Sequence, residues 1–315
     1  MKVDVVIPTM GRPAQLERAV RSLFAPANAQ MIDTLVIVDN HPDGSAEPTF
    51  VKLAAEAPFR ISYVHEPRAG VANARNAGVS ACRDATFLAF LDDDETASDQ
   101  WLSSLVSTAL DLQADVVFGP IDGVASEAPP AIRPVVEDFF SRRGPEGSGI
   151  ALIPYGCGNS LIRISVLTEP QPFDIATNET GGEDDALFAK LKNDGAVFGW
   201  SAEAKVKEHV PPHRSTYRYL MTRAFARGQG PSQTAAARCR WLELLRWNVI
   251  GIVQTVLFSG AALFARPFSE VRSTKCCIRA AEGLGKIFWF RGFEPKLYGS
   301  HELGRTSLKS GHQAT

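Results

Sequence analysis

Short apolar runs alternate with helical segments through roughly the first 120 residues, and this alternation constrains the fold more than any other feature of the chain. The runs are rich in β-branched and aromatic residues and lie at 3–8, 34–40, 60–65, 85–91 and 114–119. The helical segments between them lie at 11–24, 45–56, 71–82 and 99–111. Near-continuous apolar strands joined by helices predict an α/β fold, with a Rossmann-like, mostly parallel sheet and helices on both faces.

Polar residues follow three of these runs at the point where each predicted strand ends. Pro8 and Thr9 end the first run, Asp39 ends the second, and the acidic residues 92–95 follow the fourth. In open parallel sheets, ligands bind beyond the carboxyl ends of the strands. We therefore expect these side chains to meet in one crevice.

The acidic stretch Asp92, Asp93, Asp94 and Glu95 comes directly after an apolar strand. Hard oxygen ligands of this kind suit Mg²⁺ or Mn²⁺, which proteins usually bind through one or two carboxylates together with substrate phosphates. The alternative is that these residues complement the dipole of the next predicted helix. Ser98 or Asp99 already offers that helix a cap, so the pattern favours the metal.

Composition excludes several classes of protein. The formal net charge of −2 gives no basic bias of the kind that nucleic-acid binding requires. Five scattered cysteines without a CxxC pair indicate reduced thiols in the cytosol and argue against a zinc site. The first apolar run is too short for a signal peptide, so we expect the catalytic part to stay in the cytoplasm.

Two later segments of the main domain differ in character. Residues 123–150 are rich in Pro, Gly, Ser and Glu, which predicts a mobile loop over the site. Regular structure is expected again at 156–167. At 181–195 two glycines and an acidic triplet precede a helix that ends at Gly195.

The last third of the chain contains a strongly apolar segment at 240–268. About twenty residues without charge lie between Arg246 and Arg266, which is the usual spanning length. Polar residues interrupt the segment and basic residues flank both of its ends, whereas a single span is expected to be asymmetric. The pattern favours a re-entrant or interfacial helix, with a single span or a buried core helix as alternatives. We predict a membrane-associating segment at 236–298, including an interfacial helix at 276–293, and a disordered tail at 299–315.

Taken together, five stretches resemble the family 2 glycosyltransferases, which have the GT-A fold. They are VVIPTMGRP at 5–13, VIVDN at 36–40, RAGVANARNAG at 68–78, FLDDDE at 90–95 and GGEDDALFAKL at 181–191. The resemblance covers roughly residues 1–230 and implies a catalytic domain at 1–235. The run at 208–230 is similar to the succinoglycan-type glucosyltransferases of exopolysaccharide assembly.

The resemblance implies roles around the nucleotide-sugar. Pro8 and Thr9 would begin the nucleotide pocket, and Asp39 would contact the uracil or the ribose; its alternative role is to form a turn. The residues Arg68, Asn73, Arg75, Asp92 and Asp93 would also bind the donor. For the arginines, the alternative is a solvated helix face.

The resemblance also implies the metal and catalytic positions. Asp94 would be the direct ligand of Mg²⁺ or Mn²⁺, with Asp92 beside it and His209 as a further candidate. Asp184 would be the base that removes the acceptor proton, with Asp185 as the alternative. The acceptor side is expected at Gly158, Asn159, Glu183 and Asp185. Dipole complementation at the start of a helix is the competing explanation for the acidic triplet.

The implied reaction is the inverting, metal-dependent transfer of a hexose from a UDP-sugar to a hydroxyl of a lipid-linked or oligosaccharide acceptor. It would serve exopolysaccharide or cell-surface glycan synthesis at the cytoplasmic face of the inner membrane, through a peripheral, monotopic or single-span attachment. The chain lacks a QxxRW motif, so we expect a non-processive enzyme. The alternatives are a polyprenyl-phosphate sugar synthase and a non-catalytic nucleotide-sugar-binding module. A nucleotidyltransferase is disfavoured because no GxGxR loop follows the first strand.

Overall fold

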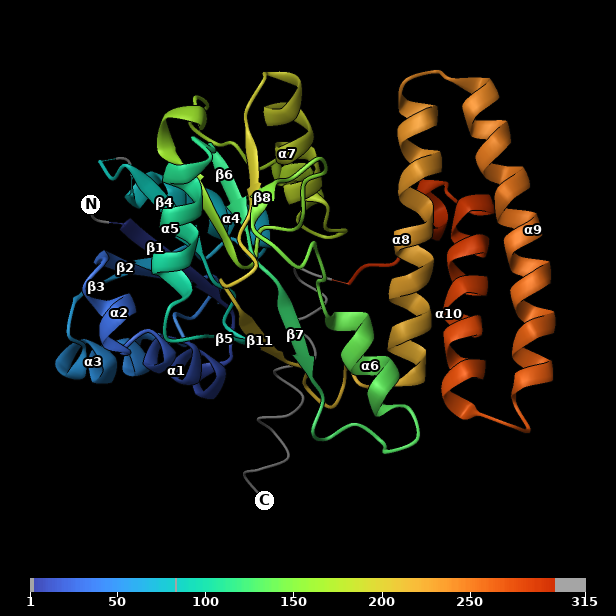
Figure 1. Cartoon of the computed structure of the whole chain (residues 1–315), viewed down its shortest axis with the longest axis horizontal. Coiled ribbons are helices and arrows are strands. Elements are labelled where there is room, and N and C mark those ends of the chain that lie inside the picture. Colours follow the sequence, from blue (N-terminus) through green and yellow to red (C-terminus); the bar gives the residue numbers. More distant parts are fainter. Residues whose placement is uncertain (1–2, 83, 298–315) are drawn as a thin grey trace. The chain divides into compact units, whose positions relative to one another are not determined.

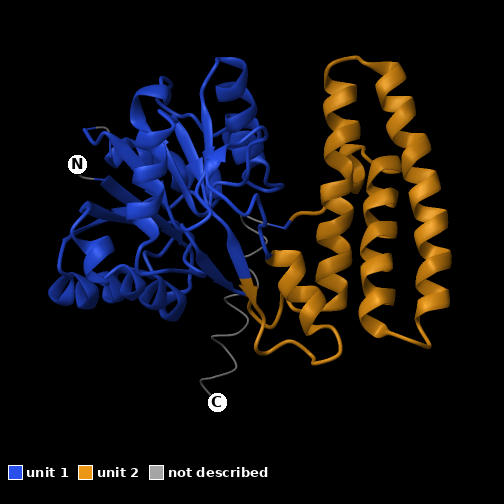
Figure 2. Cartoon of the chain, in the orientation of Figure 1, with its two compact units in different colours: residues 1–122, 141–209, 297–315 blue, residues 123–140, 210–296 orange. Residues whose placement is uncertain are grey.

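The computed structural model describes residues 3–82 and 84–297 (Figure 1). The chain divides into two compact units (Figure 2). We call residues 1–122 and 141–209 the sheet unit, and residues 123–140 and 210–296 the helical unit. The tail predicted at 299–315 lies outside the described residues.

The sheet unit is built on an eight-stranded sheet with the order β3-β2-β1-β4-β9-β6-β10-β8. Its strands are β1 Val3–Thr9, β2 Ile32–Asp39, β3 Arg60–His65, β4 Phe87–Phe90, β6 Val116–Phe118, β8 Gly149–Ile150, β9 Ser160–Arg163 and β10 Phe198–Trp200. β1 is parallel to β2 and β4, β2 to β3, and β6 to β10, whereas β9 is antiparallel to both β4 and β6 and β8 is antiparallel to β10. The predicted α/β class with a mostly parallel sheet is confirmed.

Helices cover both faces of this sheet because successive strand residues point to opposite sides. Val5 and Ile7 of β1 face a core that includes Leu16, Leu53 and Trp101, whereas Val6 faces a second core with α4 and α7. The helices are α1 Pro13–Ser22, α2 Pro26–Ala29, α3 Glu47–Glu56, α4 Val71–Ala81, α5 Trp101–Asp111 and α7 Glu183–Asn193. Short 3₁₀ turns lie at Ile164–Val166 and Ile175–Thr177.

A three-stranded sheet has the order β5-β11-β7, with β5 Glu95–Ala97, β11 Val206–His209 and β7 Ile121–Val124. β11 runs antiparallel to β5 and pairs Glu208 with Glu95. The N–H of His209 then donates to the carbonyl of Asp94, at 2.8 Å. This pairing brings a late segment of the chain to the end of the acidic stretch.

The acidic stretch is not a helix cap. α5 begins after Gln100, which makes no side-chain cap hydrogen bond, and β5 separates the helix from the acidic residues. The expectation that Ser98 or Asp99 caps this helix is wrong, because only the carbonyl of Ser98 takes part, accepting from the N–H of Trp101 at 3.1 Å.

The expected loop at 123–150 is not irregular throughout. It contains α6, Arg133–Phe140, which buries Val135, Val136, Phe139 and Phe140. These apolar pairs recur four residues apart and form one face of a helix. The prediction failed because proline and glycine on either side outweighed a short helical pattern.

The helical unit consists of α6 with α8 Tyr217–Ala237, α9 Trp241–Ala265 and α10 Glu270–Ile287, followed by a 3₁₀ turn at Arg291–Phe293. Glycines let these helices approach closely. A methyl group at Gly228 of α8 would meet the carbonyl of Glu282, and one at Gly251 of α9 would lie 2.7 Å from the carbonyl of Gly283. α10 therefore packs backbone to backbone against both α8 and α9.

α9 is the one helix of the described chain that is long and apolar enough to cross a membrane. It has 25 residues and a mean hydropathy of 1.7, and only 11% of its apolar window is buried. The structure contradicts the alternative of a buried core helix. α9 is also continuous, so nothing in it breaks the backbone as a re-entrant loop would.

Candidate active site

The site begins where β1 and β4 end side by side. Thr9 Oγ1 donates to Asp93 Oδ2 at 2.8 Å, and Arg12 Nη1 donates to Asp93 Oδ1 at 3.0 Å. The same Arg12 nitrogen lies 3.6 Å from Asp94 Oδ2. Thr9 and the acidic stretch meet as predicted, and Arg12 is a functional candidate that the sequence analysis did not identify.

The acidic stretch folds into a tight turn. The N–H of Glu95 donates to the carbonyl of Asp92 at 3.0 Å, and the N–H of Asp92 donates back to Glu95 Oε2 at 3.0 Å. Burial and the repulsion of neighbouring carboxylates raise the pKa of Asp92, raise that of Asp93 to about 6, and raise that of Glu95 well above its usual range. Burial and mutual repulsion therefore disfavour the ionised forms of these carboxyl groups.

A buried arginine joins the acidic stretch to the second acidic cluster at the start of α7. Arg75 of α4 forms an ion pair with Glu183, and its Nη2 lies 3.5 Å from Asp92 Oδ1. Its guanidinium also lies over the ring of Phe173, 5.8 Å from the centroid. Burial raises the pKa of Glu183 although Arg75 opposes the shift. Arg75 thus lies beneath the site rather than on a solvated face.

Asp184 lies half-buried beside this pair, and two backbone groups orient it. Its Oδ2 accepts from the N–H of Cys157 at 3.1 Å, and its Oδ1 accepts from the N–H of Asp185 at 2.9 Å. A carboxylate has about four acceptor positions, so two remain for other partners. Asp185 is exposed. The two neighbouring carboxylates therefore differ in burial and in hydrogen bonding.

Two glycines fit the segment 156–158 between the two acidic clusters. A methyl group at Gly158 would lie 2.7 Å from Asp92 Oδ2 and 3.0 Å from Glu95 Oε1, and one at Gly156 would lie 3.1 Å from Asp184 Oδ2. Gly158 thus lies against the acidic stretch, and its role on the acceptor side stays a prediction.

Asn159 is placed differently. It is fully buried in the left-handed region, with a φ of 50°. Its Oδ1 accepts from Trp101 Nε1 at 2.8 Å, and its Nδ2 donates to the carbonyls of Pro120 and Ala204, each at 2.8 Å. All of these partners are internal, so the side chain holds the segment in place and does not face an acceptor.

Arg142 is a second candidate that the sequence analysis did not identify. Its Nη2 donates to the carbonyl of Gly156 at 2.9 Å, and its guanidinium lies 6.0 Å from the centroid of the Tyr155 ring. Burial lowers the pKa of Arg142, whereas Glu95 and Asp184 raise it. Its only signal in the sequence was a basic residue in the segment taken for a loop.

The end of β2 forms a preorganised loop. Asp39 is fully buried and accepts from the N–H groups of His41 and Ala46 and from the hydroxyl of Tyr63, at 3.0, 2.5 and 3.0 Å. Burial and this carboxylate raise the pKa of Tyr63. Asp39 therefore forms the turn. Because a carboxylate has about four acceptor positions, these three hydrogen bonds leave one for a ligand.

Asn40 ties the same loop to the start of α4. Its Nδ2 donates to the carbonyls of Glu66 and Arg68, at 2.9 and 2.8 Å, and its Oδ1 accepts from the N–H of Gly70 at 2.7 Å. Gly70 has a φ of 139°, which side chains rarely adopt. The strand ends are therefore linked by side chains rather than only lying near one another.

Arg68 and Asn73 line a polar pocket of about 200 Å³ in the sheet unit. Arg68 is bidentate to Glu66, at 2.8 and 2.7 Å, and two-thirds of its side chain is exposed. Asn73 Nδ2 donates to the carbonyl of Arg68 at 3.0 Å. The three residues predicted from the 68–78 stretch thus separate: two border this pocket, and Arg75 joins the acidic clusters.

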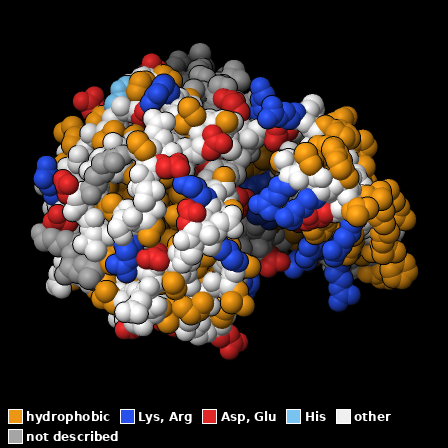
Figure 3. All heavy atoms as spheres, turned by 90° about the horizontal axis from the view of Figure 1, so that it is seen from above, with side chains coloured by type: hydrophobic (Ala, Val, Ile, Leu, Met, Phe, Trp, Pro, Cys, Tyr) orange, Lys and Arg blue, Asp and Glu red, His pale blue; other side chains and the backbone are white. Residues whose placement is uncertain are grey.

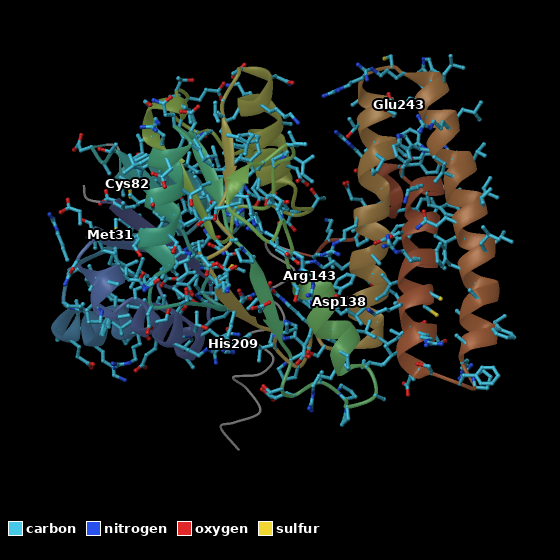
Figure 4. The ribbon with its side chains drawn as sticks, in the orientation of Figure 1. Met31, Cys82, Asp138, Arg143, His209 and Glu243 are labelled. Atoms are coloured by element: carbon cyan, nitrogen blue, oxygen red, sulfur yellow. The ribbon has the colours of Figure 1, made fainter. Side chains whose placement is uncertain are left out.

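The donor atoms near the acidic stretch bear on the predicted metal site. Among the described residues, no three His, Cys, Asp or Glu side chains are arranged to hold a metal ion by themselves. His209 Nε2 lies 3.0 Å from Thr96 Oγ1, and Figure 4 shows it at the end of β11. The carboxylates of Asp92 and Asp94 nevertheless fit Mg²⁺ or Mn²⁺ chemically, because substrate phosphates usually complete such sites.

Several basic residues that follow His209 in the chain belong to the helical unit. They include His213, Arg214, Arg223 and Arg227. Arg223 and Arg227 lie over the rings of Phe140 and Phe139, at 5.3 and 4.2 Å from the centroids. These two arginines stabilise the packing of α8 against α6.

Comparisons with known proteins agree with this architecture. The family model described as glycosyl transferase family 2 matches residues 4–168. Over 312 residues the chain is 32% identical to the succinoglycan biosynthesis protein ExoM of Rhizobium meliloti (strain 1021), covering 96% of this chain and 97% of that protein. It is 29% identical over 265 residues to the pre-mycofactocin glycosyltransferase of Mycobacterium tuberculosis, covering 79% of this chain and 53% of that protein.

One solved structure supports the fold. S. aureus TarS 1–349 in complex with UDP has a TM-score of 0.53 and 15% sequence identity, covering 93% of this chain and 92% of that chain. At this identity the likeness concerns the fold, and the GT-A fold implied by the sequence is confirmed.

Proposed function

The chain belongs to glycosyltransferase family 2, and from this premise we propose that it transfers a hexose from a UDP-sugar to a hydroxyl of a lipid-linked or oligosaccharide acceptor. The proposed reaction inverts the anomeric centre and depends on a divalent metal ion. One observation supports this proposal above the others. Arg75 contacts both Asp92 and Glu183, and so brings together the two acidic clusters, 92–95 and 183–185, at the end of β4.

The donor is proposed to bind along the carboxyl ends of β1, β2 and β4. Pro8, Thr9 and Asp39 would border the nucleoside, and Asp92 and Asp93 would lie near the ribose and the sugar. The contacts of Thr9 and Arg12 with Asp93 support this assignment, because they join β1 to the acidic turn. Arg68 and Asn73 would also contact the nucleotide. The buried Arg75 would hold Asp92 in position.

Asp94 and Asp92 would hold Mg²⁺ or Mn²⁺, and His209 remains a further proposed ligand. When bound, the metal ion would stabilise the negative charge that grows on the departing diphosphate. Arg12 would hold Asp93 and Asp94 in place in the absence of substrate. The raised pKa of Asp93 agrees with a site that is complete only when a cation is present.

Asp184 is the proposed base. An inverting transfer needs a carboxylate that takes the acceptor proton while the hydroxyl oxygen attacks the anomeric carbon. The N–H groups of Cys157 and Asp185 fix both oxygens of Asp184 and leave acceptor positions open. Gly158 and Asp185 would border the acceptor, whereas Glu183 would act through Arg75 and Asn159 through the packing of its segment.

The names of the relatives support a place in exopolysaccharide or cell-surface glycan synthesis. The apolar α9 supports an attachment to a membrane, which we propose to be the cytoplasmic face of the inner membrane. We propose residues 1–235 as the catalytic domain and 236–298 as the membrane-associating segment, although contacts group residues 210–235 with the later helices. The missing QxxRW motif supports transfer of one sugar per encounter.

The test is release of UDP or GDP from a panel of UDP- and GDP-sugars, with Mg²⁺, Mn²⁺ or EDTA. We expect slow, metal-dependent hydrolysis of one UDP-sugar by the wild type and its loss in Asp94→Ala. Glu203→Ala, which removes an exposed carboxylate, is the control and should behave as the wild type. Absence of turnover together with absence of metal-dependent nucleotide binding by calorimetry would contradict the proposal.

A further inference from the structure

α9 presents a continuous apolar face that nothing in the described part of the helical unit covers. Its exposed apolar residues recur at helical spacing, and Leu242 is 86% and Phe264 77% exposed. The others are Trp241, Leu245, Val249, Ile252, Val253, Val256, Leu257 and Leu263. Figure 3 shows hydrophobic side chains gathered along the right-hand edge, over this unit, with Lys and Arg beside them. A face of this length is unusual on a protein surface in contact with water.

The polar residues that interrupt α9 in the sequence point away from this face. Gln254 Nε2 donates to the carbonyl of Arg279 at 2.7 Å, and Thr255 Oγ1 donates to the carbonyl of Gly251 at 2.7 Å. Asn248 Nδ2 donates to the carbonyl of Leu244 at 2.9 Å. Between Trp247 and Ala265, only Ser259 remains as a polar side chain on the exposed side.

The packing of α10 against α9 argues against a transmembrane orientation of α9. α10 runs along α9, from Ser273, whose Oγ donates to the carbonyl of Ala262, to Gly283, which lies against Gly251. α10 carries a charge on nearly every turn, at Arg272, Lys275, Arg279, Glu282 and Lys286. If α9 crossed a bilayer in this packing, α10 would carry these charges into the hydrocarbon, where they are costly.

The helical unit is also strongly basic. It holds fifteen Lys and Arg residues and seven Asp and Glu residues, a formal charge of +8 in a chain of net charge −2. Exposed arginines stand at both ends of α9, at Arg240, Arg246 and Arg266. Basic side chains at both ends suit a helix whose two ends lie at the same leaflet.

From these contacts we infer that α9 lies in the plane of one leaflet of an anionic membrane, with its apolar face among the acyl chains and α10 on the water side. The inference rests on the membrane attachment included in the proposed function and specifies its mode and its lipid. The occupant of the apolar face is thus a phospholipid surface rather than a second copy of the chain.

The first test is flotation of the full-length protein with vesicles of phosphatidylcholine, with and without phosphatidylglycerol. We expect binding to the anionic vesicles that weakens at high salt. Val253→Ser/Leu257→Ser should lower the partition about tenfold or more. Leu152→Ser/Ile153→Ser, a matched change of exposed apolar residues in the sheet unit, should leave it unchanged. Arg240→Gln should lower it about fivefold on anionic vesicles only.

The second test separates lying from spanning. Cys239 marks one end of α9, and Pro267→Cys marks the other; both positions are exposed. A membrane-impermeant maleimide should label both in inverted membrane vesicles and neither in spheroplasts, as read by peptide mass spectrometry. Labelling of one position from each side would show a span and overturn the inference.

Two further outcomes are decisive. A protein that stays unbound to both kinds of vesicle and elutes as a dimer, which Val253→Ser/Leu257→Ser converts to a monomer, would assign the face to a second copy and overturn the inference. Hydrolysis of the UDP-sugar in the same preparation reports on the sheet unit independently. Vesicle binding with neither turnover nor metal-dependent nucleotide binding would support this inference while contradicting the proposed reaction. Turnover without vesicle binding would support the reaction and overturn this inference.

Discussion

The two units of this chain distribute charge and apolar surface in opposite ways. In the sheet unit, carboxylates are buried, and the pKa values of Asp92, Asp93, Glu95 and Glu183 are all raised chiefly by burial. In the helical unit, apolar side chains are exposed along one face of α9. The helical unit carries a formal charge of +8 and the rest of the chain −10.

Each arrangement is unfavourable for a protein alone in water. Burying a carboxylate costs free energy unless a partner compensates for it, and exposing a long apolar face costs free energy unless something covers it. We therefore propose that a cation and an anionic ligand complete the sheet unit and that an apolar surface covers the helical unit. The following predictions test whether ligand binding by the sheet unit and burial of the apolar face of the helical unit are independent.

The largest effect is expected at the proposed base. Asp184→Asn should lower kcat for transfer to a sugar hydroxyl by about 10²- to 10⁴-fold, because the amide cannot take the proton. Donor binding, measured by calorimetry, should change little. Asp194→Asn, an exposed position at the other end of α7, is the control and should stay within a few-fold of the wild type. Full transfer by Asp184→Asn would indicate an acceptor that is already ionised, such as a lipid phosphate.

The second prediction concerns the contribution of the buried ion pair between Arg75 and Glu183 to the stability of the sheet unit. Arg75→Met should destabilise the protein by about 3–5 kcal/mol, because it leaves Glu183 buried without its charged partner. The double variant Arg75→Met/Glu183→Gln should recover part of this loss in urea unfolding. The exposed pair offers a control, since Lys52→Met, which breaks the contact with Glu17, should change the stability very little. Equal losses for the two single variants would contradict the buried role.

The sequence could predict those features whose pattern lies within one contiguous stretch of residues. The strands, both acidic clusters and the apolar segment are contiguous patterns, and the structure has strands and helices where they were expected. Arg142 and Asn159 could not be placed, because their roles depend on partners far along the chain. Arg142 contacts the carbonyl of Gly156, and Asn159 contacts Trp101 and Ala204.

The orientation of α9 was likewise beyond the sequence. Composition alone left lying and spanning open, because both need an apolar stretch of similar length. The structure adds which residues face α10, namely Gln254 and Thr255, and which charges accompany them. That information resides in packing rather than in the order of residues.

A smaller effect tests the close packing of the helical unit by itself. Gly228→Ala should destabilise the protein by about 1–3 kcal/mol, because the added methyl group meets the carbonyl of Glu282. Gly230→Ala, two residues along α8, has open space around it and should gain up to about 1 kcal/mol from helix propensity. Thermal unfolding of the two variants compares them directly. Neither change should affect hydrolysis of the UDP-sugar if the helical unit and the sheet unit function independently.

The smallest effect links the buried carboxylates to a cation through pH. The pKa of Asp93 is about 6 in the folded protein and about 3.8 for an ordinary aspartate, so between these values only the folded state holds the proton. Its contribution to stability is therefore present at low pH and is lost as the pH rises through 6. A cation that binds the ionised carboxylates should offset this loss. The rise in Tm caused by Mn²⁺ should be larger at pH 7.5 than at pH 5, by roughly a few °C, and should disappear with EDTA.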